Sequence, residues 1–199
     1  MQTLGLQGES KRSDGRLKSI FWPTVENAWD VDYLGRQGFW ICVVIAIVQV
    51  AFAGISRSPV LLVFSLAEGL IFFIGGMGVR ESSWPAAALV FSIFFLNLLS
   101  TIAQGQFPGV LMIIGCGILL SNVRAAFLAS EWKPAAEDED RPSRFSESFG
   151  DKLVDVMPAK LWPVLQIPFY GLAALILLLS LFGLAAIALR QFGVLPHAG

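Results

Sequence analysis

Five long apolar runs, separated by polar stretches, dominate this chain. They extend over residues 39–55, 60–77, 85–103, 107–129 and 163–189. Nearly uncharged runs of about 18 or more residues are typical of helices that cross a lipid bilayer. The pattern therefore predicts an all-α integral membrane protein with five transmembrane helices.

Some of the polar connections between these runs are very short. Only residues 56–58 separate the first run from the second, and only residues 104–106 separate the third from the fourth. Connections of this length join antiparallel neighbours. We therefore expect two antiparallel helix hairpins and a fifth, single helix.

Two further segments carry apolar residues at helical spacing, with acidic residues on other sides of the helix. In each segment a large apolar or aromatic residue recurs at every fourth position: Phe21, Val25, Trp29 and Tyr33 in the first, and Phe145, Phe149, Leu153 and Met157 in the second. This spacing predicts two short amphipathic helices at the membrane interface. They either cushion the starts of the first and fifth transmembrane helices or form a docking face for a protein partner.

These features divide the chain into six parts. We predict a disordered tail over 1–18, an interfacial helix over 19–37, a four-helix transmembrane unit over 38–130, an acidic linker and amphipathic helix over 131–160, a fifth transmembrane helix over 161–190 and an outer tail over 191–199. The acidic run within the linker is bracketed by prolines, which favours a solvated spacer over a cation-binding or partner-binding loop. Pro163 and Pro168 predict that the fifth helix follows the interface before it crosses the membrane.

The basic residues predict the orientation, because lysine and arginine that flank membrane spans are retained on the cytoplasmic side. With the N-terminus inside, the cytoplasmic segments hold Lys11, Arg12, Arg16, Lys18, Arg36, Arg80, Arg124, Lys133, Arg141, Arg144, Lys152 and Lys160, and the outside holds only Arg57 and Arg190. Tryptophan prefers the bilayer interface, and all six tryptophans fall on the same predicted side: Trp22, Trp29, Trp40, Trp84, Trp132 and Trp162. We expect a cytoplasmic N-terminus and an outer C-terminus.

The composition agrees with insertion into a membrane. Hydrophobic residues make up 55% of the 199 residues and charged residues only 15%, and no basic cluster points to nucleic acid. The first apolar run begins at Phe39 behind a polar stretch, so we expect no N-terminal signal peptide. The predicted location is a bacterial inner (plasma) membrane.

One acidic residue, Glu68, falls near the middle of the second apolar run. A charged side chain at the centre of a bilayer costs about 2.5 to 3.5 kcal/mol, so such residues usually face a bundle interior or water. Gln49 and Asn97 lie at similar depths in the first and third runs, which predicts a polar cluster between three helices. Glu68 either fixes helix packing as a hydrogen-bonding group or handles protons or cations.

Two arginines, Arg80 and Arg124, fall near the inner ends of the second and fourth runs. A long basic side chain there can extend to the lipid headgroups. The alternative that we keep open is a joint contact of the two guanidinium groups with a lipid phosphate or an anionic substrate.

The glycines of the second run do not resemble a phosphate-binding loop, because they lack the strand before them and the lysine after them. Small residues inside spans instead permit close helix packing, and we expect Gly76 and Gly78 to end the second helix. Cys42 and Cys116 lie inside apolar runs and are expected to be small buried hydrophobes.

The chain contains a single histidine, His197. A single histidine in the outer tail does not suffice for a haem site with two histidines, a histidine-rich metal site or Ser-His catalysis. We therefore expect no catalytic residues, no cofactor and no metal site. The leading hypothesis is a non-enzymatic multi-pass scaffold or accessory subunit that acts through its cytoplasmic face, with a protein partner or a second copy of itself in the bilayer. The alternatives are a small transporter or channel centred on Glu68 and a lipid-modifying enzyme.

Overall fold

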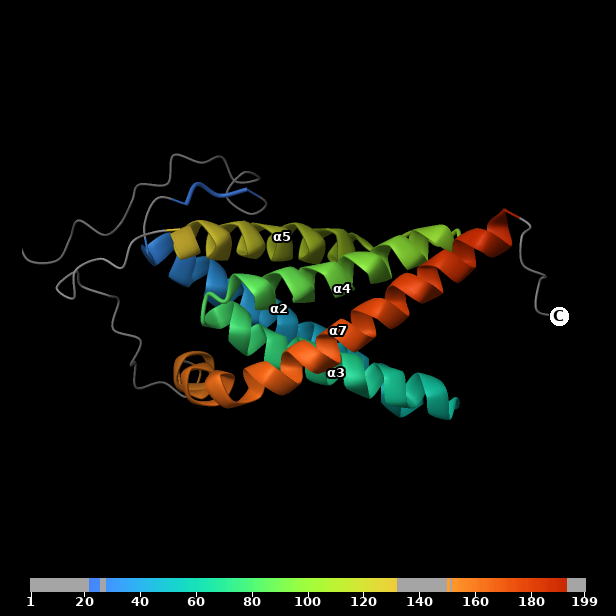
Figure 1. Ribbon diagram of the computed structural model, residues 1–199, viewed down its shortest axis with the longest axis horizontal. Helices are drawn as coiled ribbons and strands as arrows, with labels where there is room; N and C mark the ends of the chain where they lie inside the picture. Colours follow the sequence, from blue (N-terminus) through green and yellow to red (C-terminus); the bar gives the residue numbers. More distant parts are fainter. Residues whose placement is uncertain (1–21, 26–27, 132–149, 151, 193–199) are drawn as a thin grey trace, which may run out of the picture.

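The computed structural model describes residues 22–25, 28–131, 150 and 152–192, and in these parts it contains helices and no strands (Figure 1). The long helices are α2 (Ala28–Ile55), α3 (Pro59–Arg80), α4 (Trp84–Ala103), α5 (Val110–Glu131) and α7 (Met157–Gln191), and a short π-helix, η1 (Lys152–Val156), precedes α7. Within the described residues, five helices are long and apolar enough to cross a membrane. The predicted all-α membrane protein with five spans is confirmed.

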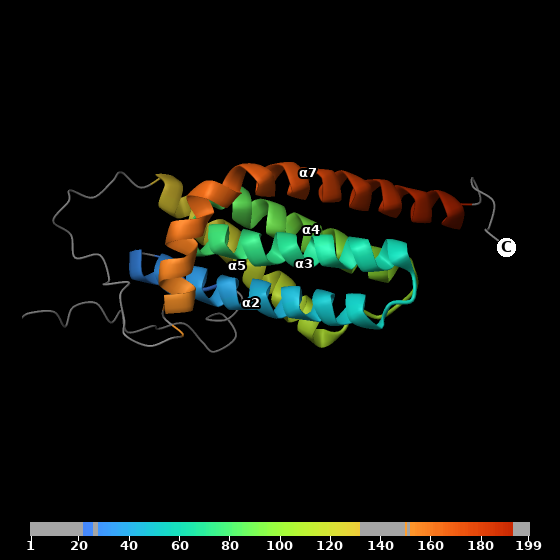
Figure 2. The same ribbon diagram turned by 90° about the horizontal axis from the view of Figure 1, so that it is seen from below.

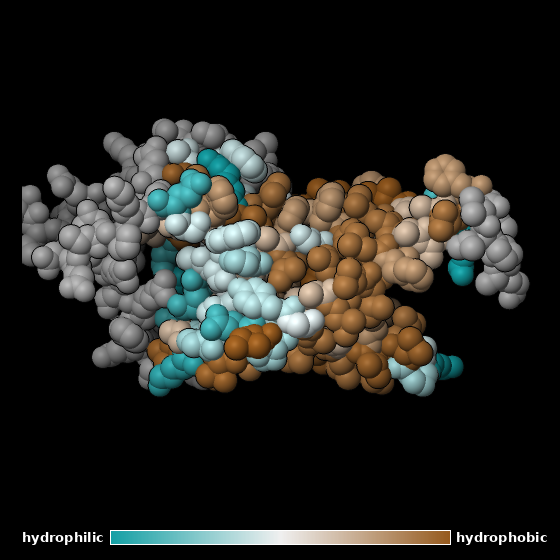
Figure 3. Space-filling model, viewed as in Figure 1, coloured by the Kyte–Doolittle hydropathy of each residue, from teal (hydrophilic) through white to brown (hydrophobic). Residues whose placement is uncertain are grey.

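The helices form two antiparallel hairpins, α2–α3 and α4–α5, and α7 crosses the outside of α3 and α4 (Figures 1 and 2). Because the spans alternate in direction, one end of the bundle collects the start of α2, the end of α3, the start of α4, the end of α5 and the start of α7. On the face that Figure 3 shows, polar residues gather at this end, and the surface over the middle of the bundle is largely hydrophobic. We call it the polar end.

Helix α2 begins earlier than the sequence suggested. Residues 28–37, predicted to belong to a separate interfacial helix, continue without a break into the first span. No proline interrupts this stretch, and Leu34 and Phe39 are both buried. Gly35 lies so close to the main chain of Val79 and Arg80 that an added Cβ would be 3.3 Å from the Val79 oxygen. Packing against the end of α3 therefore holds the first turns of α2 in line with the span.

Glycines on α3 allow three helices, α2, α4 and α7, to approach it. A Cβ on Gly75 would overlap the Val90 side chain, one on Gly76 would lie 2.8 Å from Cys42, and one on Gly78 2.6 Å from both Ala86 and Trp162. The predicted packing role of these glycines is thus correct, but the predicted helix end at Gly76 to Gly78 is wrong. The helix continues to Arg80, and the chain turns at Ser82, which has a φ of 54°.

Helices α4 and α5 differ from the prediction only at their ends. Helix α5 begins at Val110 rather than at residue 107, so the connection after α4 covers residues 104–109. Gly105 within it has a φ of +74°, a conformation that glycine adopts without steric cost. The predicted hairpin pairing is unaffected.

The start of the last helix lies across the polar end of the bundle. Pro158 lies in the first turn of α7, where proline's missing N–H is tolerated. The chain then bends and runs along the bundle axis (Figure 2), and α7 contains Pro163 and Pro168, which remove main-chain hydrogen bonds. That this first part of α7 follows the membrane interface stays a prediction.

Several predictions concern residues outside the described parts of the chain. They are the disordered tail over 1–18, the acidic run over 134–142, the aromatic residues Phe21, Phe145 and Phe149, and His197.

Candidate functional site

The predicted polar cluster forms where α2, α3 and α4 meet. The Gln49 side-chain amide donates a hydrogen bond of 2.6 Å to Oε2 of Glu68, and the Asn97 amide donates one of 3.2 Å to Oε1. Glu68 is only 4% exposed. Beside it, Gly69 brings α3 close to the main-chain oxygen of Ala46 on α2. One residue from each of three helices thus takes part in a single hydrogen-bonded group.

Both carboxylate oxygens of Glu68 accept hydrogen bonds from other side chains of the protein. Each oxygen accepts from an amide on a different helix, so the carboxylate joins α3 to α2 on one side and to α4 on the other. Asn97 is itself tied to its helix, because Thr101 donates to its main-chain oxygen at 2.9 Å. A buried polar group satisfied in this way specifies how the helices pack. A role in transport stays a prediction.

Arg80 does not occupy the position that the sequence suggested. Its side chain is 2% exposed and lies between two acidic residues rather than among lipid headgroups. Nη1 is 2.7 Å from Oδ1 of Asp32 on α2, while Nε and Nη2 donate to Oδ1 of Asp155 on η1 at 3.0 and 2.5 Å. The expected lipid or anion contact of Arg80 is therefore replaced by a buried ion-pair network.

This network connects three parts of the polar end: the first turns of α2, the last turn of α3 and η1. Arg80 also donates to the main-chain oxygen of Asp32 at 3.3 Å. A planar guanidinium suits such a junction, because its five N–H groups point in fixed directions and hydrogen bonds between charged groups are the strong ones. Removing one partner from a buried ion pair is strongly destabilising, so each residue of the network supports the others.

Arg124 makes different contacts. Nη1 donates to the main-chain oxygen of Pro23 at 2.9 Å, and the guanidinium carbon lies 4.7 Å from the centre of the Trp22 ring. A cation over an aromatic face is a stabilising arrangement. Arg124 thus holds the segment before α2 against α5, and the structure does not join it with Arg80 in one anion site.

Several other polar side chains of the described helices form hydrogen bonds within the bundle. Asn122 donates to the main-chain oxygen of Ile118 at 2.9 Å, and Ser83 and Tyr170 join α4 to α7 through hydroxyl groups 3.1 Å apart. Cys42 and Cys116 are free thiols, and Cys42 is buried in the core. Within the described residues, no three acidic, histidine or cysteine side chains lie together as a metal site would require.

Comparison with known proteins gives no match: no protein-family model, no curated protein and no solved structure is similar to this chain. The function is therefore argued from the geometry alone.

Proposed function

We propose that this protein is a non-enzymatic membrane scaffold or accessory subunit, with its N-terminus and polar end in the cytoplasm. The observation that carries the proposal is how the buried charged groups are used. Glu68 and Arg80 each bind partners from two other parts of the same chain, so they hold helices in place. A transporter would instead need its intramembrane charge to exchange partners with a cation or with water.

The exposed apolar face of α7 supports contact with a partner in the membrane. In its second half Leu178 is 64% exposed and Phe182 77% exposed, and α7 is the least buried of the five candidate spans. The chain therefore presents a long apolar helix with a largely exposed face at one side of the bundle. Such a helix suits contact with the transmembrane segment of another subunit, where packing of side chains drives association.

The experiment is purification of the tagged protein from membranes in a mild detergent, with the subunit ratio measured by mass spectrometry of the intact complex. We expect a partner or a second copy at a fixed ratio. The double variant Leu178→Ala with Phe182→Ala should lower its yield several-fold. The matched control is Val48→Ala with Phe52→Ala, because these residues are also exposed but lie on α2.

A result that would overturn the proposal is a wild-type protein that purifies alone and carries protons or cations into proteoliposomes. That outcome would support the alternative of a small transporter that uses Glu68. Loss of the complex in both double variants would show that the partner does not bind specifically to α7.

A further inference from the structure

The exposed face of α7 has a regular pattern along the helix. Residues without a polar side chain recur at alternating spacings of four and three, and all of them are exposed: Val164, Pro168, Gly171, Leu175, Leu178, Phe182, Ala185 and Leu189. We call this set the α7 stripe. On the opposite side of the helix Phe169, Ala173 and Ile176 are buried against the bundle. The stripe therefore faces away from the rest of the described chain, and α7 forms one edge of the bundle in Figure 2.

The spacing and the length of the α7 stripe suit contact with a second transmembrane helix. Contact positions that alternate between three and four residues keep two helices in register when they cross at about 20°, which is the usual geometry of helix pairs in membranes. The stripe is about 38 Å long at 1.5 Å per residue, and the hydrocarbon core of a bilayer is about 30 Å thick. It can therefore pair with another helix over the full thickness of the membrane.

Gly171 gives a second, independent observation on this face. Most glycines of the described helices lie at close helix contacts, because an added Cβ would be 3.4 Å or less from another atom of the bundle: Gly35, Gly38, Gly69, Gly75, Gly76, Gly78 and Gly115. Gly171 lies on the stripe, and an added Cβ there would have no heavy atom within 4 Å. Glycine inside a helix is less favourable than alanine, but it allows another helix to approach closely. No contact within the described bundle uses this property at Gly171.

We propose that the α7 stripe is the contact between two copies of this chain, with α7 packed against α7. Both copies insert in the same direction because they carry the same basic residues, so the two helices are parallel and a two-fold axis along the membrane normal relates them. Each stripe residue then lies near its own counterpart. The stripe permits this, since none of its side chains is charged or forms hydrogen bonds. This dimer contact rests on the proposed function, because it names the partner of the same face of α7.

The sizes of the stripe residues agree with such a crossing. The two helices are closest at Gly171, where neither copy has a side chain. They separate toward Phe182, about 17 Å further along the helix, and the large ring fills the wider space there. The order of small and large residues therefore suits a pair of identical helices that cross near the polar end.

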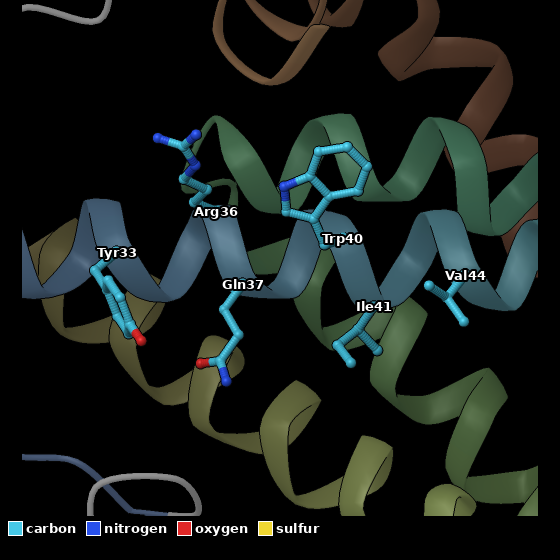
Figure 4. A pocket seen from close by; sticks show the side chains of 6 residues that line it. All are labelled: Tyr33, Arg36, Gln37, Trp40, Ile41 and Val44. Carbon is cyan, nitrogen blue, oxygen red and sulfur yellow. The ribbon is translucent and has the colours of Figure 1, made fainter. Parts of the chain in front are cut away.

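The outer face of α2 is another exposed surface, and its chemistry suits a second copy less well. A groove on this face is lined by Tyr33, Arg36, Gln37, Trp40, Ile41 and Val44 (Figure 4). Tyr33 and Arg36 take part in interactions within the chain. A two-fold contact on α2 would bring polar and charged side chains of both copies together, which opposes association. The α7 stripe carries no such groups.

The first test is cross-linking of single cysteines in membranes. In a background with Cys42 and Cys116 replaced by alanine, Leu178→Cys should form a disulfide-linked dimer on mild oxidation with copper phenanthroline, because the two copies of this residue lie close together. The matched control is Val48→Cys on α2, since Val48 is 60% exposed and Leu178 64% exposed. We expect little cross-linked dimer from the control.

The second test changes the crossing point and not the contacts within one copy. Gly171→Leu should weaken dimerisation about tenfold, which is about 1.4 kcal/mol, and leave the helix content of each copy unchanged. The measurement is energy transfer between labelled copies in liposomes at several ratios of protein to lipid. Gly54→Leu on α2 is the matched control, because an added Cβ there also has no heavy atom within 4 Å, and it should dimerise as wild type does.

The possible outcomes separate this dimer from the proposed function. A wild-type protein that holds a different protein at a fixed ratio, without a second copy, would overturn the dimer and leave the proposed function intact. A wild-type protein that purifies alone would overturn both. The dimer through α7 is also overturned if Leu178→Cys and Val48→Cys cross-link equally, or if Gly171→Leu and Gly54→Leu dimerise equally.

Discussion

Two buried charged residues organise this bundle, and the sequence predicted only one of them correctly. The partners of Glu68 were predictable, because the rise per residue gives the depth of Gln49 and Asn97 in neighbouring spans. The partners of Arg80 were not, since Asp32 and Asp155 lie 48 and 75 residues away along the chain and were assigned to interfacial helices. A basic side chain at the end of a span can extend to the lipid headgroups or form an ion pair with an acidic residue from another helix. Only the tertiary structure shows which of these two contacts is made.

Substitution of Glu68 distinguishes a structural from a transporting carboxylate. Glu68→Gln keeps one acceptor oxygen, and its NH2 group can bond to the second partner once that partner's amide turns its oxygen toward it, so we expect a change in stability of less than about 1 kcal/mol. Glu68→Leu removes both hydrogen bonds, and such bonds average only about 0.6 kcal/mol each in membranes, so it should lower the stability by about 1 kcal/mol and still fold. The measurement is thermal unfolding in detergent, together with proton and cation flux in proteoliposomes. Flux in wild type that disappears in a folded Glu68→Gln variant would contradict the structural role.

Close packing at Gly78 makes a second prediction for a single residue. An alanine there would place its Cβ 2.6 Å from Ala86 and from the Trp162 ring, so α4 and α7 must both shift. We expect Gly78→Ala to lower the free energy of unfolding by about 1 to 3 kcal/mol, the usual cost of overpacking. The control is Gly183→Ala on α7, where an added methyl group would have no heavy atom within 4 Å, so this variant should be neutral or stabilising. Equal melting temperatures for Gly78→Ala and wild type would show that the helices are not this close.

At the scale of elements, the hydrophobic pattern predicted which residues form helices better than where those helices begin. The hairpins followed from connections too short for any other arrangement. The early start of α2 could not be predicted from the sequence. Residues 28–37 show the same hydrophobic period whether they form a separate helix on the membrane surface or extend the first span, and contacts with α3 decide between the two. The bend near the start of α7 could be predicted, because the two prolines inside this helix are visible in the sequence, and the structure contains such a bend (Figure 2).

The ion pair between Arg80 and Asp155 holds η1 against the end of α3, and this attachment can be tested. Asp155→Asn removes the negative charge while keeping an acceptor oxygen, so we expect a loss of about 1.5 to 3 kcal/mol in stability. Faster hydrogen exchange should appear in residues 152–160, because η1 is then held less firmly. Glu131→Gln is the matched control, since it neutralises an exposed acid at the polar end. Exchange that increases equally in both variants would argue that the pair does not anchor η1.

At the scale of the whole molecule, the sequence and the structure contribute different information. The fold brings one end of every span to the polar end, and Arg36, Arg80 and Arg124 lie at this end on α2, α3 and α5. The side of the membrane on which the polar end lies is a prediction from the charge asymmetry alone, because both orientations have the same internal contacts. The orientation therefore needs its own experiment.

Single cysteines placed on the two predicted sides provide that experiment. In a background with Cys42 and Cys116 replaced by alanine, a cysteine at Ser13 or Ser143 should be shielded from a membrane-impermeant thiol reagent in intact cells, and one at Ala198 should be labelled. All three should react after the membrane is permeabilised, which controls for the reactivity of each thiol. Since retention of lysine and arginine on the cytoplasmic side sets orientation, the fourteen basic residues, divided twelve to two, favour this result strongly. Labelling at Ser13 and Ser143 with protection at Ala198 would show that the topology is the inverse of the predicted one, with the polar end outside.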